Sequence, residues 1–123
     1  MDKKAMKDTN RLNTILKYCD KIEEVMREYG EDVEDFLKNS RYQDLCSFYT
    51  QQIGENAKNL SENITKRYPE IGWEDIRQTR NDIAHIYEWI DPEMIWGAIT
   101  EDVPKLKKAC ENILRELSSQ GCE

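Results

Sequence analysis

Glycine, proline and long apolar runs are all scarce in this chain of 123 residues, which contains 5 Gly and 3 Pro. That scarcity excludes collagen-like and low-complexity classes of protein. No apolar run approaches the roughly 18 residues that a membrane-spanning helix needs. Residues 1–10 are polar and lack the apolar segment of a secretory signal. We therefore expect a cytoplasmic protein that does not enter a membrane.

Positive charge is also in the minority, because 25 Asp and Glu residues outweigh 18 Lys and Arg residues and leave a net charge of −7. This balance argues against a protein that coats nucleic acid through charge alone. A nucleic-acid site in this chain would have to be small and local. The densest basic run contains Lys105, Lys107 and Lys108, and we interpret it as a solvated helix face.

Cysteine occurs at positions 19, 46, 110 and 122, but its spacing matches no metal site. None of the four belongs to a CxxC pair or to a His/Cys cluster, so we expect neither a metal nor another cofactor. The even number is compatible with two disulfides. Buried, reduced thiols are the favoured interpretation, because nothing else in the sequence indicates secretion.

Apolar residues recur at three- and four-residue spacing along most of the chain, which predicts amphipathic helices. The first stripe runs over residues 12–29, and Gly30 is expected to end it. A short helix around Phe36 follows. A capping box at residues 40–43 then starts a stripe that continues to Ile64.

Two further helices are predicted in the second half of the chain. One begins near Trp73, and the other begins at Asp91-Pro92-Glu93, with Asp as N-cap and Pro in the first turn. Pro104 is expected to kink or interrupt the last helix. Together these elements predict a single all-α domain over residues 1–123, with an ordered core at about 8–118. The expected architecture is an antiparallel four-helix bundle with a short extra helix.

The helix that begins near Trp73 breaks its own apolar pattern. On an ideal helix of about 3.6 residues per turn, Arg80 falls within the apolar arc, and Arg77, Asn81 and His85 lie beside it. An unpaired guanidinium buried in a core would cost several kcal/mol. One interpretation is structural: Arg80 pairs with an acid such as Glu55, and His85 interacts with the helix dipole.

A second interpretation of the same residues is chemical. Arg80 supplies a permanent positive charge that matches phosphate, and His85 exchanges protons near neutral pH. Together they are a minimum set for cleaving an RNA backbone without metal. The two residues lie about 140° apart on an ideal helix, so they do not converge within one chain. A two-fold dimer that packs this helix against its copy would bring two Arg and two His to one cleft.

The octapeptide Arg80–Tyr87, R-N-D-I-A-H-I-Y, resembles the R-x4-H-x-Y motif of the HEPN superfamily in its HepT-like branch. Residues 53–60, I-G-E-N-A-K-N-L, resemble another helix of that branch. Residues 68–73, Y-P-E-I-G-W, resemble its approach to the motif, although Tyr68 replaces a histidine and Gly72 replaces a proline. Residues 102–106 resemble its D-L-P-x-L. The similarity runs from about residue 8 to residue 117.

The resemblance implies an all-α homodimer that is the toxin of a type VII-like toxin–antitoxin pair. It implies an RNA substrate cleaved without metal, with Arg80 and His85 as catalytic residues and Asn81 as the polar residue after the arginine. Glu55 and Arg77 are supporting candidates. The implied partner is a nucleotidyltransferase (MntA-like) antitoxin, which in some pairs adenylylates the motif tyrosine, here Tyr87. The structural interpretation of Tyr87 is a core aromatic residue.

Two other functions remain open at this point. The chain could be a non-catalytic HEPN helical module that binds, or is modified by, a nucleotidyltransferase partner. The acidic residues around the motif favour this alternative somewhat, because an acidic surface repels RNA. A purely structural bundle, in which the motif is a chance match, is the third and weakest reading.

Overall fold

The computed structural model describes residues 3–76 and 91–121, and within them every regular element is a helix. The elements are α1 (Lys3–Tyr29), α2 (Val33–Leu37), α3 (Ser40–Lys58), α4 (Glu62–Arg67), α6 (Pro92–Gly97), a π-helical turn η2 (Ala98–Asp102) and α7 (Val103–Gly121). Residues 73–76 form the first turn of a further helix. The all-α prediction is confirmed for this part of the chain. The two-fold dimer stays a prediction, because the structure contains one chain.

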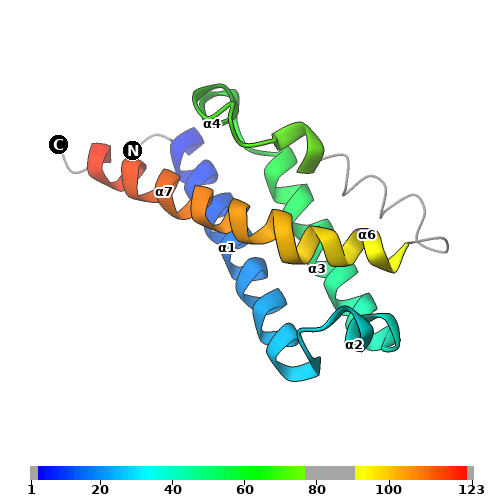
Figure 1. Ribbon diagram of the computed structural model, residues 1–123. Coiled ribbons are helices and arrows are strands. Elements are labelled where there is room, and N and C mark those ends of the chain that lie inside the picture. The colour runs from blue at the N-terminus through cyan, green and yellow to red at the C-terminus, as the bar shows by residue number, and fades with distance from the viewer. Residues whose placement is uncertain (1–2, 77–90, 122–123) are drawn as a thin grey trace.

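Helices α1 and α3 run antiparallel, and α6, η2 and α7 follow one another as one continuous rod that crosses both (Figure 1). The two short helices α2 and α4 lie at opposite ends of this arrangement (Figure 1). The sequence predicted one short extra helix, and the described residues contain two. None of the described helices has the length and apolar character needed to cross a membrane.

The core is formed by the apolar stripes that the sequence spacing predicts. Leu12, Ile15, Cys19 and Ile22 of α1 are fully buried. They belong to one cluster with buried residues of the other long elements, namely Tyr42, Cys46, Ile53, Ala57, Ile95, Ile99, Val103, Leu106, Cys110 and Ile113. Burial of these stripes on facing sides of three helices supplies the main driving force for the fold.

Gly30 ends α1, as predicted, because its backbone adopts a conformation that other residues avoid. Its φ is +120°, which is accessible to glycine at little cost. The hydroxyl of Tyr42 donates a hydrogen bond of 2.9 Å to the Gly30 carbonyl and so ties the end of α1 to α3. Tyr42 also packs edge-on against Phe36, with ring centroids 4.9 Å apart. The short helix α2 is therefore held by its one buried aromatic residue.

The second predicted stripe is interrupted where a continuous helix was expected. Helix α3 ends at Lys58, and α4 begins at Glu62 after Ser61 as N-cap. The cause is Asp8, whose buried carboxylate accepts hydrogen bonds from the Ser61 backbone N–H at 2.9 Å and from its hydroxyl at 2.5 Å. These bonds hold the chain in a turn. The start of α3 also differs by one residue, because Asn39, not Ser40, is the N-cap and accepts from the Tyr42 N–H.

Pro104 interrupts the last helix, as expected, but without a sharp break. The preceding five residues, Ala98–Asp102, widen into a π-helical turn, and α7 continues directly from Val103. The Val103 N–H bonds to the Ala98 carbonyl, five residues back. A single π-turn inserts a residue into an otherwise helical rod, and such turns are frequent at functional sites. Asp91 caps the beginning of this rod by accepting from the Glu93 N–H at 3.0 Å, with Pro92 in the first turn, as predicted.

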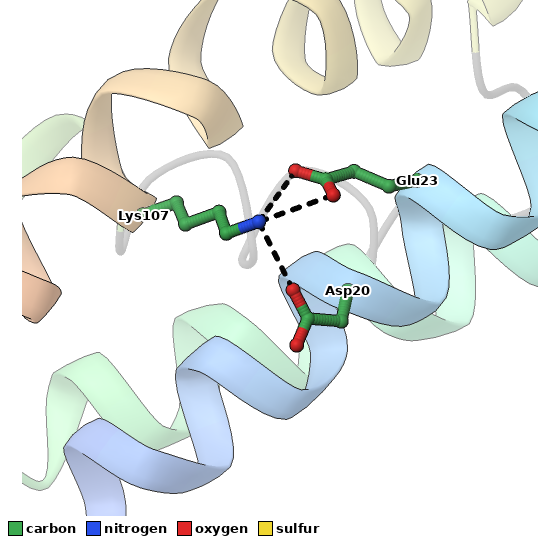
Figure 2. A network of polar contacts seen from close by, with 3 residues as sticks. All are labelled: Asp20, Glu23 and Lys107. Atoms are coloured by element: carbon green, nitrogen blue, oxygen red, sulfur yellow. Dashed lines mark hydrogen bonds and ion pairs between the residues drawn. The ribbon is translucent and has the colours of Figure 1, made fainter.

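Lys107 joins α7 to α1, so the expectation of a wholly solvated basic face is wrong at this position. Its ammonium lies 2.9 Å and 3.1 Å from the two carboxylate oxygens of Glu23 and 3.1 Å from Asp20 (Figure 2). Hydrogen bonds to Glu23 and Asp20 raise the pKa of Lys107. The neighbouring Lys105 and Lys108 are exposed, as expected.

The thiols of Cys19, Cys46 and Cys110 are free and buried, which confirms the prediction of reduced core cysteines at these positions. Burial raises the pKa of each thiol to about 12, so each stays protonated near neutral pH. Cys122 lies outside the described residues.

The hydrogen bonds between Asp8 and Ser61 generate a test of this fold. We expect Asp8→Ala to lower the free energy of unfolding by about 2 kcal/mol, because charge-assisted hydrogen bonds are lost and the half-buried Ser61 donors lose their acceptor. Urea denaturation followed by circular dichroism measures the change. Asp44→Ala, at an exposed position of α3, is the matched control and should be neutral. Equal effects of the two substitutions would contradict the role assigned to Asp8.

Candidate functional site

Five of the predicted site residues, Arg77, Arg80, Asn81, His85 and Tyr87, lie in residues 77–90, outside the part of the chain that the structure describes. Their geometry therefore stays a prediction. The structure does describe both ends of this segment and the surface beside its beginning. We call these described elements, which include the helix start at residues 73–76 and the beginning of α6, the frame of the segment.

The segment begins from a helix start that is firmly held. The Ile76 N–H donates to the Gly72 carbonyl at 3.1 Å, so the helix starts at Trp73, as predicted. Trp73 is buried, and its indole N–H donates to the Tyr68 carbonyl at 3.1 Å. Glu74 and Asp75 stand in the first turn, where the helix dipole favours negative charge.

Tyr68 anchors the approach to this helix, at the position where the resembled family has a histidine. Its ring is buried, and its hydroxyl donates a hydrogen bond to the carboxylate of Glu116 on α7. Burial and this hydrogen bond raise the pKa of Tyr68. Arg67 adds an ion pair of 3.9 Å to the same carboxylate. The loop before Trp73 is thus fixed to α7 by a buried aromatic residue and a charged pair.

A cavity of about 520 Å³ lies beside the beginning of this helix. Its apolar wall comes from α3, the helix start, η2 and α7, and includes Ile53, Ile76, Ala98, Val103 and Leu106. Glu70, Asp75, Asp102 and Lys105 supply its polar lining. The volume falls within the range of small-molecule and peptide sites, about 300–1,000 Å³. The predominance of carboxylates favours positively charged groups at its mouth.

Thr50 is an anomaly in the wall of this cavity. Its side chain is 7% exposed, and its buried hydroxyl oxygen has no hydrogen-bond partner among the residues that the structure describes. A helical threonine can bond to a carbonyl one turn back, as Thr100 does to Trp96 at 2.7 Å. A buried hydroxyl without a partner costs free energy relative to an apolar group of the same shape.

Glu55, the supporting residue predicted on α3, is half-buried, and its Oε2 atom is shielded from solvent. The Asn59 amide donates to the Glu55 carbonyl at 2.8 Å and lies 3.5 Å from its Oε1 atom. A shielded carboxylate is a suitable partner for a cation. The predicted pairing with Arg80 is not tested, because that arginine lies outside the described residues. Among the residues described, no three His, Cys, Asp or Glu side chains cluster as metal ligands would.

Several features of this frame were missed by the sequence analysis. The roles of Tyr68, Glu116 and Thr50 leave no periodic signal, because each depends on contacts between residues far apart in the chain. The π-turn had a partial signal in Pro104. Trp73 was expected on the apolar arc, and its burial confirms that expectation.

Comparison with known proteins assigns the chain to a family. Residues 15–113 match the family model described as "Ribonuclease HepT-like". A protein of Thermococcus cleftensis named "Probable ribonuclease HepT" is 32% identical over 102 residues, which cover 83% of this chain and 91% of the relative. A "Putative RNase" of Methanocaldococcus jannaschii is 30% identical over 87 residues, covering 71% of this chain and 72% of the relative. No solved structure matches the chain significantly.

A third relative, from Caldanaerobacter subterraneus, is also named "Putative RNase" and is 29% identical over 105 residues, covering 85% of this chain and 92% of the relative. The range matched by the family model contains Glu55, the whole segment 77–90 and both of its described ends.

The anomaly at Thr50 generates a second prediction. Thr50→Val keeps the shape of the side chain and removes the unpartnered hydroxyl, so we expect it to raise the free energy of unfolding by about 1 kcal/mol. Thermal and urea denaturation measure this change. Thr100→Val is the matched control, and it should lower the free energy of unfolding because it removes the hydrogen bond from Thr100 to the Trp96 carbonyl. A loss of stability in Thr50→Val would show that the hydroxyl is satisfied in solution.

Proposed function

The chain belongs to the HepT-like ribonuclease family, and we propose that it is a metal-independent endoribonuclease that acts as the toxin of a toxin–antitoxin pair. The observation that carries the proposal is the family match over residues 15–113, which includes an intact R-x4-H-x-Y sequence at residues 80–87. The names of the relatives as ribonucleases support the RNA-cleaving activity.

The proposed chemistry uses one proton-transfer group and one fixed charge. In its neutral form, the His85 imidazole takes the proton of a ribose 2′-hydroxyl, and the oxygen attacks the adjacent phosphorus. The bond from phosphorus to the 5′-oxygen breaks, and a protonated imidazole gives that oxygen a proton. The products are a 2′,3′-cyclic phosphate and a free 5′-hydroxyl. Arg80 stabilises the additional negative charge on the phosphoryl oxygens in the transition state.

This chemistry requires a second copy of the chain. Acid and base act at opposite ends of the reacting phosphate, and the chain contains 1 His. Arg80 and His85 also lie about 140° apart on an ideal helix. We therefore propose a two-fold dimer in which each chain contributes one histidine and one arginine to a shared cleft. Asn81 and Arg77 would line this cleft and bind phosphate or ribose oxygens.

The described frame supports such a cleft, because it fixes both ends of the motif segment. Trp73 is buried at one end and Asp91 caps α6 at the other. Rigid attachment of this kind is needed where catalytic groups from two chains must meet within hydrogen-bond distance. Tyr87 would lie near the face of Arg80, two helical turns further on.

We propose that the partner is a nucleotidyltransferase antitoxin that neutralises the toxin by adenylylating Tyr87. The added phosphate would compete with RNA for the arginine charge, because both are anions that guanidinium binds. The carboxylates at Glu70, Asp75 and Asp102 beside the motif segment offer complementary charge to a basic partner.

The alternative function is a non-catalytic module that the same partner binds or modifies. The carboxylates of the cavity are the observation that favours it, since they repel an approaching RNA strand. The two functions differ in one measurable property, which is cleavage of RNA by the purified dimer.

The ribonuclease function predicts the effect of two substitutions. We expect Arg80→Ala and His85→Ala each to reduce RNA cleavage by at least about a hundredfold, because each removes a group that acts in the transition state. Cleavage of labelled RNA in the presence of EDTA, with detection of the cyclic phosphate, measures the activity. Arg115→Ala, at an exposed site on α7, is the control and should retain activity.

Equilibrium sedimentation and circular dichroism establish that the variants remain folded dimers. Cleavage that persists in His85→Ala would exclude the proposed mechanism. A wild-type chain that cleaves no RNA, yet binds the nucleotidyltransferase, would establish the non-catalytic module instead.

The antitoxin hypothesis predicts a covalent change on one residue. Incubation with the nucleotidyltransferase and ATP should add one AMP per chain at Tyr87 and abolish cleavage. Tyr87→Phe should accept no AMP, because it lacks the oxygen that forms the phosphodiester bond. Intact-mass and peptide-mass analysis measure the modification. Inhibition of Tyr87→Phe to the same extent as the wild type would point to a blocked cleft without modification.

A further inference from the structure

Between Lys3 and Val25, helix α1 separates its charges onto two sides, although the chain as a whole is acidic. At about 100° per residue, six basic side chains of α1 occupy one arc of about 140°. No acidic residue falls in this arc between Lys3 and Val25, and Glu28, near the end of α1, is the acid of the helix that does. We call the six the α1 basic flank: Lys3, Lys4, Lys7, Arg11, Lys17 and Lys21.

Three acids of α1 are used elsewhere in the fold, whereas Glu24 and Glu28 are exposed near the end of the helix. Asp8 is buried against Ser61. Asp20 and Glu23 turn toward α7, where they hold the Lys107 ammonium (Figure 2). The basic flank forms no ion pair with any residue that the structure describes. Its charge is therefore available to a ligand in solution.

Three aromatic rings lie beside this flank. Tyr18, near the centre of the arc, packs in a tilted arrangement against Phe48 and Tyr49 of α3, with ring centroids 6.3 Å and 5.8 Å apart. Phe48 and Tyr49 lie 5.9 Å apart, which closes the group into a cluster. Phe48 is 46% exposed, although a phenyl ring gains free energy from burial. The Lys17 ammonium lies 5.7 Å from the centre of the Tyr18 ring.

We propose that the α1 basic flank and this aromatic cluster form a binding surface for single-stranded RNA. The cations would bind successive phosphates, and the exposed face of Phe48 would stack on a base. The flank extends over residues 3–21, about 27 Å of helix, which is long enough for several nucleotides. The proposal rests on the proposed ribonuclease function, since it concerns the substrate of that enzyme.

RNA fits this surface better than an acidic protein does. Both would be attracted by the lysines, but a flat exposed ring next to ammonium groups matches the alternation of base and phosphate along a strand. The surface lies away from the cavity, because Thr50 and Ile53 of α3 face the cavity and stand about 200° and 140° around the helix from Phe48. It would therefore hold a part of the RNA remote from the cavity and from the helix start at Trp73.

The test measures binding separately from cleavage. A fluorescently labelled 20-nucleotide RNA with 2′-O-methyl riboses cannot be cleaved by attack of the 2′-oxygen, and its anisotropy reports binding to the full chain. We expect Lys7→Gln/Lys17→Gln/Lys21→Gln to weaken binding by about tenfold or more at 0.1 M salt. The slope of log affinity against log salt should fall by about 2, because three phosphate contacts are lost.

The control variant Lys58→Gln/Lys66→Gln/Lys108→Gln removes the same charge from α3, α4 and α7, and it should bind RNA within about twofold of the wild type. Phe48→Ala should weaken binding by about tenfold with an unchanged salt slope, because a lost stacking contact releases no counterion. Together, these effects distinguish a specific RNA-binding surface from non-specific attraction of RNA to any positively charged side chain.

Three outcomes would overturn the inference: unchanged binding in the flank variant, equal loss in the control variant, or displacement of the RNA by polyglutamate as effectively as by unlabelled RNA. The last result would identify the flank as a site for an acidic protein. Failure of the ribonuclease function would appear in the cleavage assay of the His85 variant. The anisotropy measurement does not depend on that outcome.

Discussion

Burial of one apolar stripe on α1 is the constraint on which the other elements depend. Leu12, Ile15, Cys19 and Ile22 lie fully buried along a single side of this helix, and α3 and α7 both pack against it. Because that side is occupied, the polar residues of α1 are divided between its two edges. Asp20 and Glu23 stand at the edge toward α7 and bind Lys107. The lysines and Arg11 stand at the edge toward α3, where they remain unpaired among the described residues.

The long helices were predictable because their information is local. Spacing of apolar residues is visible within a dozen residues, and so are the stop at Gly30, the cap at Asp91 and the helix start at Trp73. The break between α3 and α4 was not predictable from spacing. It depends on Asp8, which lies 53 residues away in sequence and binds Ser61.

The candidate site was predicted from a different kind of information. An arginine within an apolar arc departs from the amphipathic pattern of its own helix. In natural sequences, such departures occur mainly at functional or strained sites. That reasoning selected Arg80 and His85 as candidates, and their roles stay a prediction, although the family match covers both positions. It did not identify Tyr68, whose buried ring and hydrogen bond to Glu116 hold the loop before the helix start at Trp73. An aromatic residue in a loop carries no periodic signal.

The division of charge on α1 explains how a chain with a net charge of −7 can be compatible with binding RNA at one surface. A protein that bound RNA over its whole surface would need a positive balance, because every phosphate contact adds to affinity without regard to position. An acidic chain with one basic flank instead repels RNA from most directions and attracts it to one. A surface of this kind would select the orientation of the strand before the reacting phosphate reaches the proposed dimer cleft. The carboxylates of the cavity have the complementary effect, because they disfavour RNA at a face that a basic protein partner can occupy.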